Sequence, residues 1–192
     1  MNVPDSTHIQ QENAVLRREL AQAREQIAAL EKLAREDGLT GLLNRRSFDL
    51  ELARAVSLQA RYGQPAVLVL ADLDGLKRLN DRLGHPSGDA VLRHVAEILL
   101  ASIRASDIAA RVGGDEFALI LWQISPEATT AKIAELEARM AASPLVLVSE
   151  RLVAKASFGF AALKPGTSAS ATYAAADAAL YAQKALRIAI RR

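Results

Sequence analysis

Four acidic residues stand at two points of the sequence where predicted strands end or turn. Asp72 and Asp74 close a long apolar run, and Asp115 and Glu116 follow a pair of glycines between two short β-type segments. Because residues two apart in a strand face the same side, Asp72 and Asp74 are expected to point toward one site. Mg²⁺ prefers oxygen ligands and shares its remaining positions with water and substrate phosphates. We therefore predict a metal on Asp72 and Asp115, although a single aspartate of this kind is more often an ordinary turn residue.

Polar residues that suit a nucleotide lie close to these acids in the sequence. Lys77 follows the first acidic pair and could meet a phosphate as a point charge. Asn80, His85 and Asp89 lie on a segment predicted to cross the same end of the sheet, where a carboxylate and an amide can together read the edge of guanine. Each residue also has an ordinary reading, with Lys77 solvated, His85 in a turn and Asp89 near a helix N-terminus.

The elements that must position these residues follow from the hydrophobic pattern. We expect helices over 45–61, 76–83, 87–103, 126–141 and 171–188, and strands over 66–73, 108–112, 117–122 and 152–163. The apolar run over 66–73 predicts a central strand covered on both faces, and Asn44 is expected to cap the first helix. The glycine pair Gly113-Gly114 lets a ligand approach closely and predicts a β-hairpin, which favours a mixed sheet over a parallel one.

A separate helix is expected in front of this domain. Apolar residues recur at alternating spacings of four and three, with Ile9 one heptad earlier; they are Leu16, Leu20, Ala23, Ile27, Leu30 and Ala34. Because a lone helix would leave this stripe exposed to water, we predict a parallel coiled-coil dimer over 9–36, after a loose tail over 1–8. Asn13 falls on the seam, where a polar residue often fixes register. A helix folded back on its own domain is the alternative.

Composition excludes several classes of function. The 192 residues are 51% hydrophobic and 24% charged, which is typical of a globular chain, and the lack of cysteine excludes disulfides and Cys-based zinc sites. A net charge of +2 and 4% aromatic residues argue against a nucleic-acid partner. No run approaches the length of a membrane span and the N-terminus does not resemble a signal peptide, so we expect no membrane segment and a cytoplasmic location.

Five blocks of the sequence resemble the GGDEF domain family, the diguanylate cyclases. They are DGLTGLLNRR (37–46), DLDGLKRLNDRLGHPSGDAVLRHVA (72–96), RVGGDEF (111–117), SFGFA (157–161) and ADAALYAQK (176–184), in the family's order and spacing. The resemblance assigns residues 37–192 to this domain. It implies an α/β (α+β) fold with a five-stranded mixed sheet surrounded by helices, similar to the palm of nucleotidyl cyclases and polymerases.

The resemblance also implies an activity and a set of site residues. A homodimer with one GTP on each domain would use Mg²⁺ or Mn²⁺ to condense two GTP into cyclic di-GMP and release pyrophosphate. The implied metal ligands are Asp72, the Leu73 carbonyl, Asp115 and Glu116, and the implied catalytic residues are Asp115, Glu116 and Lys77. The implied GTP-binding residues are Asn80, His85, Asp89, Gly75, Leu76, Gly113, Gly114 and Lys184.

A second site follows from the resemblance. Arg104 and Asp107 form an RxxD motif that ends six residues before Gly113. This offset matches the family's inhibitory site for the product, cyclic di-GMP, and arginine suits the bidentate binding of phosphate or a guanine edge. The alternative reading of the motif is a surface ion pair at the end of a helix.

Two departures from the family pattern leave a second function open. Leu76 replaces the family's usual phenylalanine, which is a tolerable change in packing. Arg187 stands one position before the arginine expected four residues after Lys184, and one position is about 100° around a helix. The altered terminal helix therefore keeps open a catalytically silent domain that binds cyclic di-GMP or GTP as a regulatory module.

Overall fold

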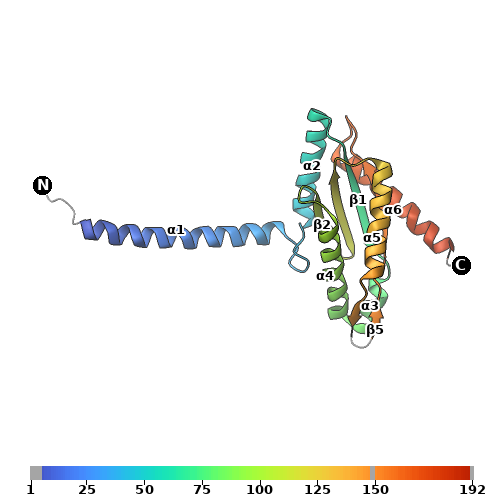
Figure 1. Cartoon of the computed structure of the whole chain (residues 1–192), viewed down its shortest axis with the longest axis horizontal. Helices are drawn as coiled ribbons and strands as arrows, with labels where there is room; N and C mark the ends of the chain where they lie inside the picture. The colour runs from blue at the N-terminus through green and yellow to red at the C-terminus, as the bar shows by residue number, and fades with distance from the viewer. Residues whose placement is uncertain (1–5, 148–149, 191–192) are drawn as a thin grey trace. The chain divides into compact units, whose positions relative to one another are not determined.

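The computed structural model describes residues 6–147 and 150–190. The chain divides between Arg35 and Glu36 into two compact units, a single helix and an α+β domain. Residues 1–5 of the predicted tail lie outside the described residues, and the first helix begins at Ser6. The elements are α1 (Ser6–Arg35), α2 (Arg45–Tyr62), β1 (Ala66–Leu73), α3 (Leu76–Leu83), α4 (His85–Ser102), β2 (Ile108–Arg111), β3 (Glu116–Trp122), α5 (Pro126–Ala142), β4 (Leu145–Leu147), β5 (Glu150–Leu152), β6 (Ala156–Ala162) and α6 (Ala169–Ile190), as Figure 1 shows.

The main sheet has four strands in the order β2-β3-β1-β6, and its neighbouring strands pair antiparallel. β4 and β5 form a separate two-stranded hairpin. The prediction of five strands in one sheet is therefore corrected to four within the described residues. Parallel pairing is present there as an isolated bridge between Leu43 and Ala110, at the β2 edge of the sheet.

The strand predicted over 152–163 contains β6, but its predicted N-terminal boundary is four residues too early. Leu152 belongs to β5, while pairing with β1 begins at Ala156. Between them Val153 and Lys155 are exposed and outside any strand. The apolar pattern indicates which face of a segment is buried, but it does not indicate which strand the segment pairs with. The break between β5 and β6 therefore cannot be predicted from this pattern.

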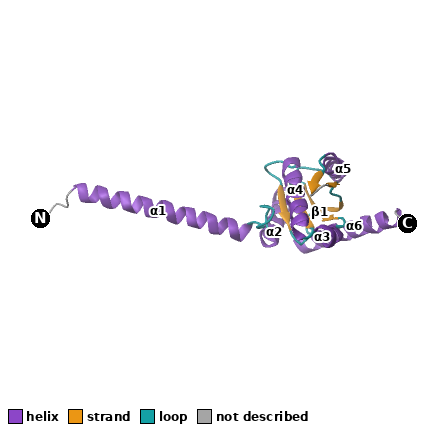
Figure 2. Ribbon diagram, turned by 90° about the horizontal axis from the view of Figure 1, so that it is seen from below, coloured by secondary structure: helices purple, strands orange, loops and turns teal. Residues whose placement is uncertain are grey.

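Alternate residues of β1 serve opposite faces of the sheet. Val67, Val69 and Ala71 pack in the cluster that contains α4 and α5, whereas Leu68 and Leu70 pack in the cluster that contains α2 and α6. This period of two is the geometry of a strand covered on both sides. Figure 2 shows the resulting layers, with α4 and α5 on one side of the sheet and α2 and α6 on the other.

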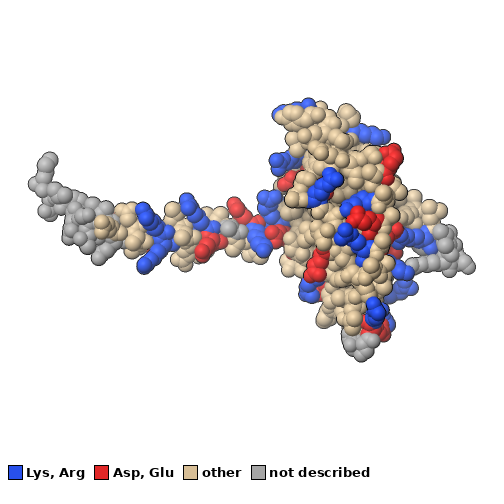
Figure 3. Space-filling view, viewed as in Figure 1, with Lys and Arg blue, Asp and Glu red and all other residues tan. Residues whose placement is uncertain are grey.

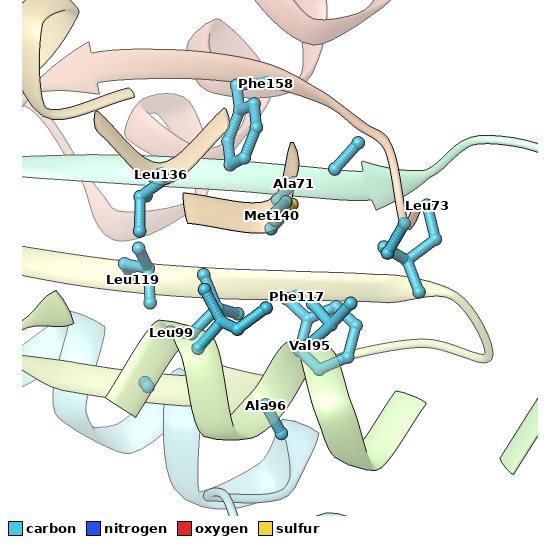
Figure 4. Packing of buried hydrophobic residues seen from close by; sticks show 14 of the residues in the cluster. Ala71, Leu73, Val95, Ala96, Leu99, Phe117, Leu119, Leu136, Met140 and Phe158 are labelled. Carbon is cyan, nitrogen blue, oxygen red and sulfur yellow. The ribbon is translucent and has the colours of Figure 1, made fainter. Parts of the chain in front are cut away.

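The core on the α4 and α5 side is built from large apolar side chains. Figure 4 shows Phe117 and Leu119 of β3 beside Val95 and Leu99 of α4, with Leu136 of α5 across the same layer. Full burial of one such side chain stabilises the fold by about 1.5–3 kcal/mol. The layer fixes β1 and β3 against the helices, and so fixes the end of the sheet that carries the acids.

Local signals in the sequence set the helix boundaries. The Asn44 side chain accepts a hydrogen bond from the Ser47 N–H at 3.0 Å and caps α2, which confirms the predicted cap. Gly63 ends α2 in the left-handed conformation, with φ of 65°. Ser125 caps α5 by accepting from the Ala128 N–H, and Pro126 occupies the first turn, where its missing N–H costs no hydrogen bond.

The predicted seam lies on a continuous helix of 30 residues. Leu16, Leu20, Ile27 and Leu30 are each 51–65% exposed, so the predicted seam is an exposed apolar stripe on this helix. The Ile9 side chain lies outside the described ones. Figure 3 shows charged side chains of both signs along α1 and over the visible face of the domain, without one sign dominating. Within the described ranges, no helix is long and apolar enough to cross a membrane.

Candidate functional site

Three strands bring polar residues together at one end of the sheet. In the strand register Asp72 lies opposite Glu116 of β3 and opposite Ser157 of β6. Directly opposed residues of antiparallel strands share a face. The Leu73 N–H donates to the Asp115 carbonyl at 3.0 Å, which ties the end of β1 to the turn between β2 and β3.

A cavity of about 310 Å³ opens at this end of the sheet. It is lined by Asp72, Leu73, Asp74, Gly75, Leu76, Lys77, Arg78, Asp115, Ser157, Lys184 and Arg187. The acids come from β1 and the β2–β3 turn, and the cations come from α3 and α6. The structure places Asp72, Asp74 and Asp115, which the sequence predicts to face one site, on the same cavity.

The cavity concentrates negative charge around Asp72. Burial raises the pKa of the Asp72 carboxyl above its usual value, and the charges of Asp115 and Asp74 add to this against the opposing effect of Lys184. The Lys184 Nζ lies 2.7 Å from Asp72 Oδ2. A metal cation bound next to Asp72 and Asp115 would relieve the remaining repulsion between these carboxylates.

Asp74 has a structural partner on each side. The Ser157 hydroxyl donates to Asp74 Oδ1 at 3.0 Å, and Arg187 Nη1 lies 3.2 Å from Asp74 Oδ2. Arg187 also donates to the Ala156 carbonyl at 2.7 Å and pairs with Glu137. Asp74 thus anchors α6 to the sheet, and Arg187 reaches the cavity despite its shifted position in the sequence.

The residues present fit a divalent metal that is shared with a substrate. Among the described residues, no three acidic or histidine side chains gather closely enough to hold a metal alone. Mg²⁺ in nucleotide sites is held by one or two carboxylates together with substrate phosphates and water. Asp72 and Asp115 supply two carboxylates in one cavity, next to the Leu73 backbone.

The glycine turn lies beside this cavity, and Gly113, Gly114 and Glu116 do not line it. A Cβ built at Gly113 would lie 2.5 Å from Glu116 Oε2, so the glutamate folds back over that glycine. A Cβ at Gly114 would meet nothing within 4 Å. Arg111 Nη2 donates to the Gly114 carbonyl at 2.7 Å and holds the turn from behind.

Asn80, His85 and Asp89 lie at the corner between α3 and α4, outside the lining of the cavity. The Asn80 side chain packs against Gly88, where an added Cβ would lie 1.9 Å from Asn80 Oδ1. That oxygen is buried and has no hydrogen-bond partner among the described residues. A buried acceptor without a partner suits a donor from a ligand, while His85 is exposed and Asp89 is half-buried.

Arg104 and Asp107 lie apart from these residues, on a cavity of about 420 Å³ beside α5. The Asp107 carboxylate accepts from the backbone N–H of Arg104 at 2.9 Å and from that of Trp122 at 3.0 Å. Asp107 therefore fixes the turn into β2. Within the described residues, the Arg104 and Asp107 side chains form no ion pair with each other.

A family profile described as "Diguanylate cyclase, GGDEF domain" matches residues 34–187. The chain belongs to the GGDEF family. This confirms the resemblance drawn from the five sequence blocks, and the matched range includes every predicted site residue of the GGDEF domain.

Known proteins similar to this GGDEF domain support the assignment. The crystal structure of the coiled coil and GGDEF domain of DgcB from Caulobacter crescentus in complex with c-di-GMP has a TM-score of 0.85 and 34% identity, and the match covers 92% of this chain and 94% of that one. An uncharacterized signaling protein of Caulobacter vibrioides is 41% identical over 84% of this chain and 20% of its own length. Diguanylate cyclase DgcP of Pseudomonas aeruginosa is 37% identical over 77% of this chain and 22% of its own length. The chain thus spans about a fifth of these two relatives.

The cavity that holds Asp72 and Asp115 also contains residues that the sequence did not predict there. Ser157, Arg78 and Arg187 all line it. The sequence held a signal for two of them, because Ser157 begins the block SFGFA and Arg78 follows Lys77 in another block. Asp74 contacts Ser157 and Arg187 only because β6 and α6 pack next to β1. No local sequence pattern predicts this packing.

Proposed function

We propose that this chain is a diguanylate cyclase, which condenses two GTP into cyclic di-GMP and releases pyrophosphate. The observation that carries the proposal is the cavity where Asp72 and Asp115 meet cations of α3 and α6. The relative named diguanylate cyclase DgcP and the c-di-GMP complex of DgcB support the same chemistry.

The reaction requires positioning and charge neutralisation more than covalent help from the protein. In each of two steps the 3′-oxygen of one GTP bonds to the α-phosphorus of the other, and the bond from that phosphorus to the bridging oxygen breaks. The 3′-hydroxyl loses its proton, and pyrophosphate leaves. Mg²⁺ or Mn²⁺, when bound, supplies a positive charge that stabilises the phosphoryl oxygens.

The chain's own residues take these roles. Asp72, the Leu73 carbonyl and Asp115 would hold the metal, and Glu116, opposite Asp72 in the register, would hold a second one. Asp115 would also promote the loss of the 3′-hydroxyl proton. Lys77 and Lys184, both on the cavity, would face the phosphates together with the backbone of Gly75 and Leu76.

The guanine would lie at the corner between α3 and α4. The buried Asn80 Oδ1 would accept from the base, and Asp89 would accept from its N1–H and N2–H groups. His85 would add a further nucleotide contact, and Gly114, where a Cβ would meet nothing within 4 Å, leaves room beside the turn that it forms with Gly113. Since each domain holds one GTP, two domains must face each other, and the apolar stripe of α1 favours a homodimer through a coiled coil.

Turnover of GTP tests the proposal. Wild type and Asp115→Ala are incubated with GTP and Mg²⁺ at concentrations where the chain is dimeric, and the products are separated by chromatography. We expect cyclic di-GMP and pyrophosphate from wild type and neither from the variant. Melting temperatures of wild type and the variant without GTP provide a control for folding. The rise in melting temperature with GTP shows whether each protein still binds the nucleotide.

One observation favours a catalytically silent binding module instead. Arg187 is held by Asp74, Glu137 and the Ala156 carbonyl, so it is committed to the fold rather than to a phosphate. A wild-type chain that binds GTP or cyclic di-GMP but forms no product would support this second function.

A further inference from the structure

The four cations around the cavity divide into two kinds. On α6, Lys184 pairs with Asp72 at 2.7 Å, and Arg187 pairs with Asp74 at 3.2 Å and with Glu137. On α3, Lys77 and Arg78 are exposed, and neither forms an ion pair or a side-chain hydrogen bond within the described residues. The cations without a protein partner therefore lie on the α3 side.

Arg78 is directed toward the start of its own helix. A Cβ built at Gly75 would lie 3.4 Å from Arg78 Nη2 and 3.8 Å from Nε, so the guanidinium lies beside Gly75 rather than in open solvent. Gly75 has φ of 80° and precedes α3 without any side-chain cap. Its missing side chain leaves space between the guanidinium and the helix terminus.

The backbone at the start of α3 has N–H groups that form no hydrogen bond within the helix. The first hydrogen bond of α3 runs from the Leu79 N–H to the Gly75 carbonyl at 3.1 Å, so the N–H groups before Leu79 have no partner within the helix. The guanidinium of Arg78 presents its own N–H groups in a planar fork that matches phosphate oxygens. Backbone and side-chain donors thus lie together at the part of the cavity lined by Gly75, Leu76 and Arg78.

We propose that Arg78 binds the β- and γ-phosphates of GTP and makes the site selective for a nucleoside triphosphate. This inference rests on the proposed function. The metal-binding acids would draw the reacting α-phosphate to their side of the cavity, and the remaining phosphates reach the start of α3. There Arg78 neutralises charge on the pyrophosphate group, the part of GTP that leaves in each step.

The experiment compares nucleotides that differ only in the phosphates beyond the first. The dissociation constants of GMP and of a non-reacting α,β-methylene analogue of GTP are measured by calorimetry with Mg²⁺, for wild type and Arg78→Gln. We expect the variant to bind the triphosphate about tenfold to a hundredfold more weakly, in line with one charge-assisted hydrogen bond. We expect GMP to bind both proteins equally well.

Kinetics and two further variants sharpen the result. The KM for GTP should rise in Arg78→Gln with little change in kcat, and Arg78→Lys, which keeps the charge but loses the fork, should lie between. Arg82→Gln is the matched control, because Arg82 is on the same helix but pairs with Glu150 at 2.7 Å. We expect it to bind both nucleotides like wild type.

The possible failures are distinguishable. Triphosphate binding that Arg78→Gln leaves unchanged, or an equal loss for GMP and the triphosphate, overturns the role of Arg78 alone. A wild type that binds no guanine nucleotide overturns the proposed function and this inference with it. Equal melting temperatures of wild type and Arg78→Gln would exclude a merely structural effect.

Discussion

Single residues decide how closely the cations of α6 approach the acids of β1. A Cβ added to Gly159 of β6 would lie 2.1 Å from the Leu180 backbone nitrogen and 2.4 Å from the Ala176 carbonyl oxygen. Because both contacts are with helix backbone, no rotamer change can relieve them. Gly159 therefore lets α6 lie directly on β6, which brings Lys184 to Asp72.

Substitution of this glycine should be severe. We expect Gly159→Ala to lower the free energy of unfolding by about 3 kcal/mol or more, at the upper end of the range for overpacked cores. Urea denaturation measures the difference. Gly38→Ala is the matched control, since a Cβ at Gly38 meets nothing within 4 Å. Equal unfolding free energies for the two variants would contradict this packing argument.

Arg104 is the residue on which product inhibition should depend. Its guanidinium is exposed at a cavity away from the acids, and Asp107 holds only its backbone. We expect Arg104→Ala to relieve inhibition by added cyclic di-GMP while the initial rate of GTP turnover changes little. Initial rates across a series of product concentrations measure this, and unchanged inhibition would count against a second site.

At the scale of elements, the segment before α2 is tied to the glycine turn by one ion pair. Arg111 Nη1 lies 3.2 Å from Asp37 Oδ1, and the two side chains are only 15% and 23% exposed. Thr40 donates to the same carboxylate from its N–H and its hydroxyl. Burial alone would raise the pKa of Asp37, but the hydrogen bonds from Thr40 and the charge of Arg111 outweigh it and hold the pKa below its usual value.

This lowered pKa predicts a pH dependence. An ionised Asp37 stabilises the fold above the unfolded pKa of about 3.9, and the contribution is lost as the pH falls through the lower folded pKa. We expect Asp37→Asn to cost about 2 kcal/mol at pH 7, as for a hydrogen bond to a charged group, and progressively less below pH 4. Denaturation of both proteins across this range measures the difference.

The control for this prediction is Asp49→Asn. Asp49 pairs with Arg45 at 3.1 Å, but both side chains are about half exposed, and such pairs contribute little. A stability difference for Asp37→Asn that stays constant from pH 7 to pH 3 would show that the carboxylate's charge is not what matters.

At the scale of the whole molecule, the proposed chemistry needs two domains, and α1 carries the surface that could join them. A dimer would cover the stripe that includes Leu16, Leu20, Ile27 and Leu30, each more than half exposed in one chain. The crystal structure of the coiled coil and GGDEF domain of DgcB matches this chain over 92% of its length. If the chain acts as the proposed cyclase, these two observations predict that its activity depends on assembly through α1.

Removal of α1 should therefore make activity depend on concentration. We expect a chain that starts near Leu33 to produce less cyclic di-GMP per molecule at low protein concentration, and to recover as concentration rises. Leu20→Glu should act in the same direction, while Gln22→Glu, which adds the same charge away from the seam, should not. Sedimentation and initial rates measured together test this, and equal activity at all concentrations would refute it.

The local structure and the family of this protein can be predicted from its sequence. Hydrophobic periodicity predicts the bounds of β1 and α3. Capping preference predicts the cap at Asn44, and turn chemistry predicts the hairpin around Gly113-Gly114. These signals are local, because each depends on residues within a few positions of one another. Motif order and spacing then identified the family before any contact was known.

Which side chains share the cavity depends on packing between distant segments and cannot be predicted from local sequence patterns. Segments far apart in the chain meet where Lys184 pairs with Asp72. The same is true where Ser157 and Arg187 bind Asp74. The separation of β5 from β6 likewise depends on which strands pair in the sheets. A sequence pattern reports which face of an element is apolar, but the partner of that face depends on packing across the whole domain. For the same reason Arg78 became a candidate for phosphate binding only after the cations of α6 were found already paired.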